Sequence, residues 1–187
     1  MGKEENLEET NPSRFYLFLY SAVTSLHQWA GNAYLFAIAA CAAVRAFALG
    51  SEVRELLADP DNPALLSRGQ QYTEDFAAIK GIFEGLYIST PSTYVLTHTS
   101  EEAIGITTRS GESLEQFQDT ILAKPELTNL GIMKSPGSGS MIISMYYPIF
   151  DGQDCIGYVG AGVYASRLMD VLRTLLYTLP LMPRSHL

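Results

Sequence analysis

The sequence predicts an α/β domain of the α+β type, in which helices flank a five-stranded antiparallel sheet. Its second half contains runs rich in β-branched and aromatic residues separated by short turns, which is the pattern of antiparallel hairpins. Its first half carries apolar residues at helical spacing, and two Asn-Pro pairs there have the form of helix starts. Strands joined by short turns pair antiparallel, and helices then cover the sheet. We expect strands at residues 82–90, 93–98, 129–135, 140–150 and 154–164.

The stretch 141–164 is the strongest hairpin signal. Gly152 accepts the positive φ that a short loop between two apolar runs needs. Pro148 cannot donate a ladder hydrogen bond, so its strand is either disrupted there or has that side facing away from a neighbour. Side chains alternate along a strand, so Gly160 and Gly162 share a face. We expect that face to be open to a helix backbone or a ligand.

A long helix should precede the sheet. Apolar residues recur at helical spacing from Asn11-Pro12 to Asp59-Pro60, which would make a helix of about 45 residues and nearly 70 Å. The alternative is two helices broken near Gly31 or Gly50. A second helix should run from Pro63 to about residue 80, where a glycine stops it.

A helical insertion separates the first two strands from the last three. Thr99 with Glu102, and Ser113 with Gln116, have the spacing of capping boxes. The insertion should contain a helical turn at Ser100–Ile104, a loop at Gly105–Glu112 and a helix at Leu114–Ala123.

Three parts follow from this order of elements. Residues 1–80 form the long helix and the second helix, residues 81–178 the sheet module, and residues 179–187 a tail. The module should end with an amphipathic helix at Arg167–Tyr177, capped by Ser166.

Composition limits the partners. The net charge of −8 over 187 residues argues against nucleic acid. Between residues 81 and 165 the cations are Arg109, Lys124 and Lys134 alone. An anionic ligand of the sheet module therefore has few possible partners.

Residues 15–44 contain no Asp, Glu, Lys or Arg, and the stretch is long enough to span a bilayer. It also contains His27, Gln28, Asn32 and many alanines, which disfavour insertion. We expect a buried helix of a soluble domain instead. The acidic N-terminus lacks the basic start of a signal peptide.

Catalytic and metal motifs have little support. Ser89, His98 and Asp151 could be drawn as a triad, but no G-x-S-x-G elbow accompanies them. Cys41 and Cys155 lie in apolar runs, and two buried free thiols are favoured over a disulfide. We expect no catalytic residues, no metal site and no cofactor.

A small-molecule pocket is the better-supported site. Arg109 lies in the polar loop of the insertion, and its guanidinium fork suits a carboxylate. The alternative is a surface arginine paired with Glu112 or Glu115. Tyrosines on the sheet can supply an apolar wall and hydroxyl donors. The candidate ligand-binding residues are Tyr87, Ser89, His98, Arg109, Lys134, Ser144, Tyr146, Tyr158 and Gly162.

Two stretches resemble Cache domains, the PAS-like sensor modules of bacterial chemoreceptors, histidine kinases and diguanylate cyclases. They are Gly-Leu-Tyr-Ile-Ser-Thr-Pro-Ser-Thr-Tyr-Val-Leu-Thr-His-Thr at 85–99 and Ile-Ser-Met-Tyr-Tyr-Pro-Ile-Phe-Asp-Gly-Gln-Asp-Cys-Ile-Gly-Tyr-Val-Gly-Ala-Gly-Val at 143–163. The most specific part is proline, an acidic turn and Ile-Gly-x-Val-Gly at 148–160. The resemblance covers about residues 11–175 and implies a PAS-like sheet behind a long N-terminal helix.

The family's amino-acid site is matched in part. Amino-acid-binding members carry an arginine followed closely by Trp-Tyr in the insertion, and here Ser110-Gly-Glu follows Arg109 instead. Those members also hold the ligand's ammonium with an aspartate near the end of the last strand, where this sequence has Gly162. We therefore expect a small carboxylate or a neutral metabolite as the ligand.

The resemblance implies an extracytoplasmic, non-enzymatic sensory domain of a cell-membrane protein, signalling by displacement of the long helix. We expect a homodimer through that helix, because its apolar surface at Phe15–Phe47 is wider than one sheet face covers. Membrane contact would come only from segments outside this chain. Two alternatives remain: a cytoplasmic PAS-like dimerisation domain without ligand, and a small hydrolase.

Overall fold

The computed structural model describes residues 35–166. The helices are Leu35–Ala48, α2 Ser51–Ala58, α3 Pro63–Lys80, the 3₁₀ turn η1 Glu101–Ala103 and α4 Glu112–Thr120. The strands are β1 Phe83–Ser89, β2 Val95–His98, β3 Thr128–Lys134, β4 Met141–Asp151 and β5 Asp154–Tyr164. The predicted fold class is confirmed.

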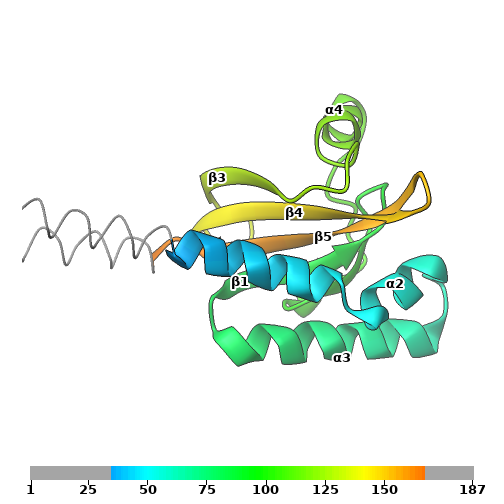
Figure 1. Ribbon diagram of the computed structural model, residues 1–187, viewed down its shortest axis with the longest axis horizontal. Coiled ribbons are helices and arrows are strands. Elements are labelled where there is room, and N and C mark those ends of the chain that lie inside the picture. The colour runs from blue at the N-terminus through cyan, green and yellow to red at the C-terminus, as the bar shows by residue number, and fades with distance from the viewer. Residues whose placement is uncertain (1–34, 167–187) are drawn as a thin grey trace, which may run out of the picture. The chain divides into compact units, whose positions relative to one another are not determined.

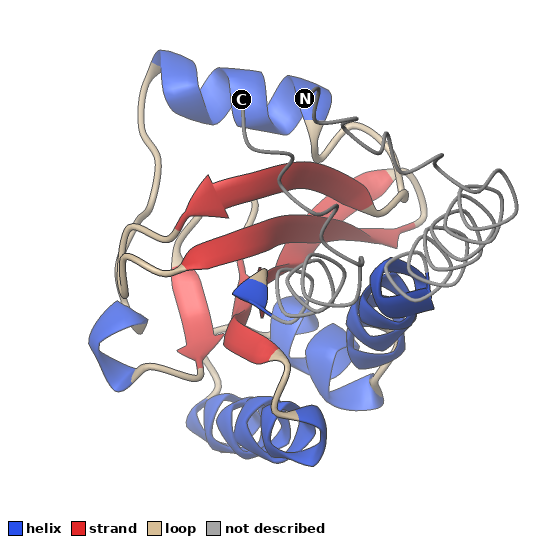
Figure 2. Cartoon of the chain, turned by 90° about the vertical axis from the view of Figure 1, so that its left-hand side faces the viewer, coloured by secondary structure: helices blue, strands red, loops and turns tan. Residues whose placement is uncertain are grey.

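The five strands form one antiparallel sheet in the order β2-β1-β5-β4-β3, drawn in red in Figure 2. Gly152 has a φ of 61° in the β4–β5 loop, as predicted. Pro148 lies inside β4 and pairs with Tyr158 of β5. The pairing of β4 with β3 stops at Tyr146, so β3 does not pair with β4 at Pro148. The strand is therefore continuous, with the side that lacks an N–H turned away from its neighbour.

One face of the sheet packs against helices. In Figure 1, α2 and α3 lie on this side, where α3 contacts β1 and β2 and α2 contacts β5. The ring of Phe76 on α3 lies 6.3 Å from that of Phe83, and Thr73 and Thr97 share a buried hydrogen bond of 2.9 Å. The fully buried apolar residues that the strands contribute to this face are Leu86, Ile88, Met145, Val159 and Val163.

The N-terminal helix is broken in the described part of the chain. Leu35–Ala48 and α2 meet at an angle of 50°, which confirms the alternative with a break near Gly50. A Cβ on residue 50 would overlap the Tyr72 hydroxyl, and that hydroxyl donates 3.2 Å to the Phe47 carbonyl. Glycine is therefore required where α3 crosses the break. The start at Asn11 and the possible break at Gly31 lie outside the described residues.

No helix within residues 35–166 is by itself long and apolar enough to cross a bilayer, although the bent pair Leu35–Ala48 and α2 together has the length and composition. Most of the stretch 15–44, together with the expected helix Arg167–Tyr177 and the tail, lies outside the described residues. The boundary at residue 178 lies there as well, and both it and the boundary at residue 80 stay predictions.

The sequence predicted both ends of α3 correctly but not the caps of the insertion. Asn62 caps α3 by accepting from the Ala64 N–H at 3.1 Å, and Gly81 ends it in the left-handed region, as expected. Both capping boxes are wrong. α4 begins after Gly111 without a side-chain cap, two residues earlier than predicted, and Thr99 instead accepts from the Leu86 N–H of β1.

The start of β2 is also corrected. The strand begins at Val95 instead of residue 93 because Thr93 has a φ of 64°, which no strand accommodates.

Candidate functional site

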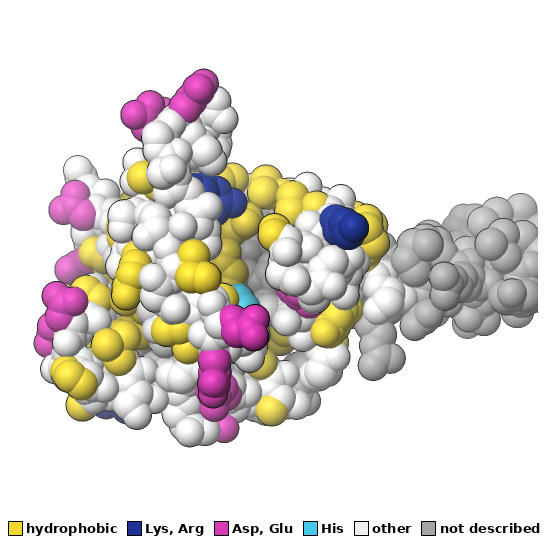
Figure 3. Space-filling view, turned by 180° about the vertical axis from the view of Figure 1, so that it is seen from behind, with side chains coloured by type: hydrophobic (Ala, Val, Ile, Leu, Met, Phe, Trp, Pro, Cys, Tyr) yellow, Lys and Arg dark blue, Asp and Glu magenta, His cyan; other side chains and the backbone are white. Residues whose placement is uncertain are grey.

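A cavity of about 480 Å³ lies on the sheet face opposite α2 and α3, within the size range of small-molecule sites. Figure 3, seen from behind the view of Figure 1, shows a hollow in the surface with the histidine colour at its edge. The insertion and the β3–β4 turn form its rim. Six of the nine predicted residues line it, namely Tyr87, His98, Arg109, Ser144, Tyr146 and Gly162.

The register of the strands explains how distant residues meet on the cavity floor. One row of paired residues crosses β4, β5, β1 and β2 and consists of Tyr146, Gly160, Tyr87 and His98. The expected open space at Gly160 is wrong, because a Cβ there would overlap the Tyr87 ring. The tyrosine ring fills the space that the glycine leaves, so this row is a packed floor.

The next row of the floor contains Ser144, Gly162 and Gly85. A bulge in β1 adds Glu84 to it, since β1 takes two steps from Phe83 to Gly85 while β5 takes one. Both Glu84 and Gly85 therefore oppose Gly162, and both line the cavity. The Ser135 hydroxyl donates 2.7 Å to one oxygen of the Glu84 carboxylate.

Arg109 lies half-buried at the rim of the cavity. Its Nη2 donates 3.2 Å to the Tyr146 hydroxyl, and its Cζ lies 4.0 Å from the ring centre of Phe117 on α4. Burial by itself lowers the pKa of Arg109, but the Tyr146 hydrogen bond and the surrounding tyrosines outweigh it, so that the pKa is raised. The expected alternative, a surface pair with Glu112 or Glu115, is wrong.

Thr93 fixes the backbone of Arg109. Its Oγ1 accepts from the Arg109 N–H at 3.0 Å and donates to the Arg109 carbonyl at 3.3 Å, while its own carbonyl accepts from Thr108 N–H at 3.0 Å. Thr93 is fully buried in the left-handed region, which β-branched residues avoid. Such strain persists only where the surroundings impose it. Here it attaches the arginine loop to the β1–β2 hairpin.

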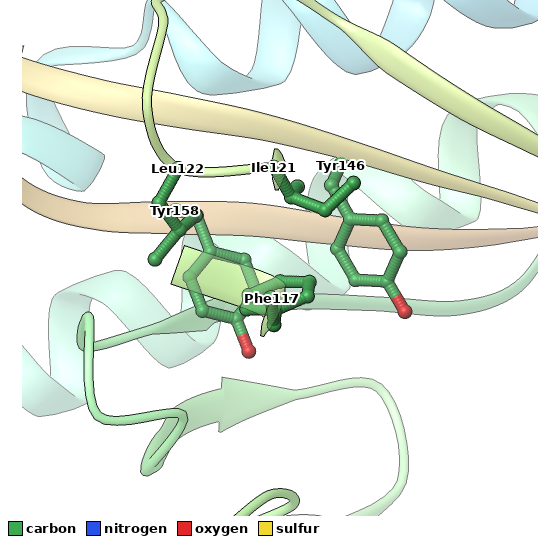
Figure 4. Close-up of a cluster of buried hydrophobic side chains, with 5 residues drawn as sticks. All are labelled: Phe117, Ile121, Leu122, Tyr146 and Tyr158. Atoms are coloured by element: carbon green, nitrogen blue, oxygen red, sulfur yellow. The ribbon is translucent and has the colours of Figure 1, made fainter. Parts of the chain in front are cut away.

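An aromatic cluster supports Arg109 from below. Figure 4 shows Phe117 between the rings of Tyr146 and Tyr158, with both ring-centre distances 5.1 Å. Burial raises the pKa of Tyr158 and of Tyr87, so both hydroxyls stay protonated. Tyr158 is completely buried in this cluster and does not line the cavity, and its hydroxyl has no hydrogen-bond partner in the described structure.

His98 presents a neutral imidazole to the cavity. The Ser100 N–H donates 2.8 Å to Nδ1, which leaves Nε2 to carry the proton. The ring stacks on Tyr87 with a centre distance of 5.2 Å. Burial lowers the pKa of His98, and the Glu84 carboxylate opposes that shift in part.

The remaining predicted residues have other places. Ser89 is fully buried, and its hydroxyl donates 2.8 Å to the Tyr94 carbonyl. Lys134 is exposed at the end of edge strand β3 and does not line the cavity. The possible triad is not assembled, since Ser89 and His98 bond elsewhere and Asp151 is exposed in the β4–β5 hairpin.

Within the described ranges, no group of three or more acidic, histidine or cysteine side chains could hold a metal ion. Cys41 and Cys155 are free thiols, as favoured, but they are half-buried instead of fully buried. Burial raises the pKa of Cys155, so its thiol stays protonated.

Two solved structures share this fold over most of the chain. The sensor domain of the Vibrio cholerae histidine kinase DctB superposes with a TM-score of 0.67 at 10% identity, over 84% of this chain and 60% of that one. The sensory domain of the Campylobacter jejuni chemoreceptor Tlp3, with isoleucine bound, gives 0.64 at 9%, over 89% and 68%. The chain has the fold of these two domains, as its resemblance to Cache domains implied.

The Escherichia coli DcuS sensor domain has the same fold, with a TM-score of 0.51 at 16% identity, over 80% of this chain and 98% of that one. The chain thus spans 60% of the DctB structure and nearly all of the DcuS structure. At these identities the likeness is one of fold. No family model and no curated protein matches the sequence.

Sequence reasoning missed Glu84. Glu84 is followed by Gly85 inside an otherwise apolar strand, and a glycine in a strand often marks a bulge. A bulge can turn the neighbouring polar side chain to the face opposite the one that simple alternation gives it. Without the register of β5, that signal does not say which face the carboxylate occupies.

Proposed function

We propose that this chain is a sensory domain that binds a small metabolite with an acidic group in the cavity above the sheet. The observation that carries the proposal is the state of Arg109. Its guanidinium is half-buried at the cavity and held by neutral groups, Tyr146 and Phe117. Among the described residues, the ion pair is the one between Arg68 and Glu55, and Arg109 forms none. The positive charge of Arg109 is therefore available to an acidic ligand.

The fold comparisons support a sensory role. The DctB, Tlp3 and DcuS structures are described as sensor or sensory domains, and Tlp3 was solved with isoleucine, L-valine and L-norvaline bound. Another, from the putative histidine kinase vpHK1S-Z8, is described as an extracellular domain. On this basis we assign the chain to the extracytoplasmic side of a cell membrane and to a non-enzymatic role. The cavity of about 480 Å³ favours this function over a ligand-free cytoplasmic dimerisation domain with a filled core.

Signalling would proceed by helix displacement. The floor and the helix-covered face belong to the same strands, so a ligand that repositions the cavity side chains also strains the strands beneath α2. Because packed interiors resist compression, α2 and the helix before it must shift together with β5.

Dimerisation through the N-terminal helix is part of the proposal. In the described segment Leu35–Ala48, Ala40, Val44 and Phe47 are buried, yet Leu35 is 62% exposed. This helix therefore carries apolar side chains on its exposed side as well as on its buried side. The exposed ones can pack against a second copy of the chain. Analytical ultracentrifugation at high micromolar concentration should give a dimer, and a monomer there would contradict it.

The ligand proposal is tested by a thermal-shift screen of small carboxylates and amino acids on wild type and Arg109→Ala. A charge-assisted hydrogen bond contributes roughly 1.5–3 kcal/mol, so its loss should weaken binding about ten- to a hundredfold. Arg68→Ala is the matched control, because Arg68 is also an arginine but lies exposed on α3.

Any ligand found should stabilise Arg68→Ala as it does wild type, and Arg109→Ala far less. Equal stabilisation of all three proteins would show that Arg109 does not contact the ligand, and the site assignment would then fail.

A further inference from the structure

We propose that Glu84 forms a second charged subsite in the same cavity, so that the ligand carries a protonated amine beside its carboxylate. This inference rests on the proposed function of Arg109, and it reverses the sequence-based expectation of a ligand without an amine. It assigns a role to a residue that belongs to neither the tyrosine floor nor the arginine loop.

The position of Glu84 is the first step. In a regular strand its side chain would alternate with Phe83 and Gly85, but the bulge places Glu84 and Gly85 together opposite Gly162. Bulges re-aim side chains in this way beside functional sites. Here the bulge brings a carboxylate onto the face where the neighbouring floor residues are small and neutral.

Gly162 makes room for that carboxylate. A Cβ built on residue 162 would lie 2.8 Å from Glu84 Oε2 and 3.0 Å from Ile142 Cδ1. Any larger residue at 162 would therefore displace the acid. The glycine that seemed to remove an acidic group from the end of β5 instead admits one from β1.

Glu84 has an unsatisfied charge. Ser135 donates to Oε1, and the described residues provide no ion pair for the carboxylate. His98 lies in the same cavity lining and feels the Glu84 charge, but its lowered pKa keeps it neutral near pH 7. A half-buried carboxylate beside a cavity, with one neutral hydrogen bond, favours a cation in that cavity.

The spacing of the two charged groups suits a single small ligand. Arg109 bonds to Tyr146, whereas Glu84 lies over Gly162, whose partner on β4 is Ser144. Tyr146 and Ser144 are two residues apart, which is about 7 Å along a strand, and Gly162 lies one strand spacing of about 4.8 Å to the side. The two anchoring positions are therefore roughly 8.5 Å apart. Two hydrogen bonds of about 2.9 Å and the width of one small zwitterion cover such a gap. A dicarboxylate would instead place a negative charge against Glu84.

The test measures affinity by isothermal titration for amino acids and for analogues in which the amine is replaced. L-Alanine, L-lactate and propionate differ at that one position, and L-leucine, 2-hydroxy-4-methylpentanoate and 4-methylpentanoate repeat the comparison with a larger side chain. The proteins are wild type, Glu84→Gln, Ser135→Ala and the exposed control Glu126→Gln.

Wild type and Glu126→Gln should bind the amine-bearing member of at least one set more than tenfold better than its two analogues. Glu84→Gln, which keeps the size of the side chain and an acceptor for Ser135, should remove most of that preference. Ser135→Ala should reduce it less, because the charge remains but its hydrogen bond is lost. This second variant keeps the test decisive if Glu84→Gln folds poorly.

Amine-free carboxylates that bind as well as the amino acids, with a dependence on Arg109 but not on Glu84, would overturn this inference and leave the proposed function intact. Binding of neither class would overturn both.

Discussion

The two faces of the sheet are built from the same strands in different ways. On β5, Val159, Ala161 and Val163 lie on the helix-covered face, and all three are buried. The alternating residues Gly160 and Gly162 face the cavity side. The helix-covered face gains its stability mainly from the burial of aliphatic and aromatic side chains between strands and helices. On the cavity face, glycines make room for the large or charged side chains that lie over them.

Because of this difference, substitutions on the two faces should affect different properties, namely the stability of the fold and the binding of a ligand. Changes on the helix-covered face act on the whole fold, whereas the cavity face contains both structural contacts and groups left free for a ligand. Tyr87 over Gly160 belongs to the first kind, and Glu84 over Gly162 to the second. Substitutions at or beside these glycines therefore test where packing ends and the binding site begins.

The largest effect is expected from Gly160→Ala. The new Cβ would overlap the Tyr87 ring, which is held by stacking on His98 and by an edge contact with Tyr158 at 6.1 Å. Overpacking of this kind costs about 1–3 kcal/mol. Urea denaturation should show that loss in the free energy of unfolding.

Gly137→Ala is the matched control, because a Cβ at residue 137 has Ser135 Oγ at 3.9 Å as its nearest neighbour. It should leave stability unchanged. Replacing Tyr87 by leucine should make Gly160→Ala less costly, since the ring is then gone. An equal cost in both backgrounds would mean that Tyr87 is not the residue that requires glycine at 160.

The helix-covered face and the hairpins were predictable because local signals agree there. The β4–β5 hairpin follows from two apolar runs around Gly152, and α3 from Asn62-Pro63 and Gly81. Arg109 was predictable for a different reason. The module has so few cations that the one in the insertion had to be considered, although its partners Tyr146 and Phe117 could not be named.

The cavity face resisted prediction because its contacts depend on register and on broken local rules. Thr93 occupies a backbone region that threonine avoids, and no sequence pattern announces this. Glu84 reaches the cavity only through a bulge, whose side is set by pairing with β5. We expected open space at Gly160 because the sequence shows that this residue has no side chain. The sequence does not show that the Tyr87 ring of β1 fills that space.

The smallest effect, and the finest measure of the cavity face, concerns His98. Burial lowers the pKa of its imidazole in the folded protein below the unfolded value of about 6.5. Between those two pKa values the unfolded chain binds a proton that the folded chain does not, so the free energy of unfolding falls as the pH is lowered through 6.5. Glu84 attracts the proton and reduces the shift in part.

The variant His98→Asn keeps an acceptor near the Nδ1 position for the Ser100 N–H but does not titrate. Chemical denaturation of both proteins between pH 5 and 8 should give parallel curves above about pH 7 and a loss confined to wild type below it, with Glu84→Gln making that loss larger. A difference between wild type and His98→Asn that is independent of pH would mean that the imidazole is solvated as in the unfolded chain, and that this edge of the cavity is open water instead of a binding surface.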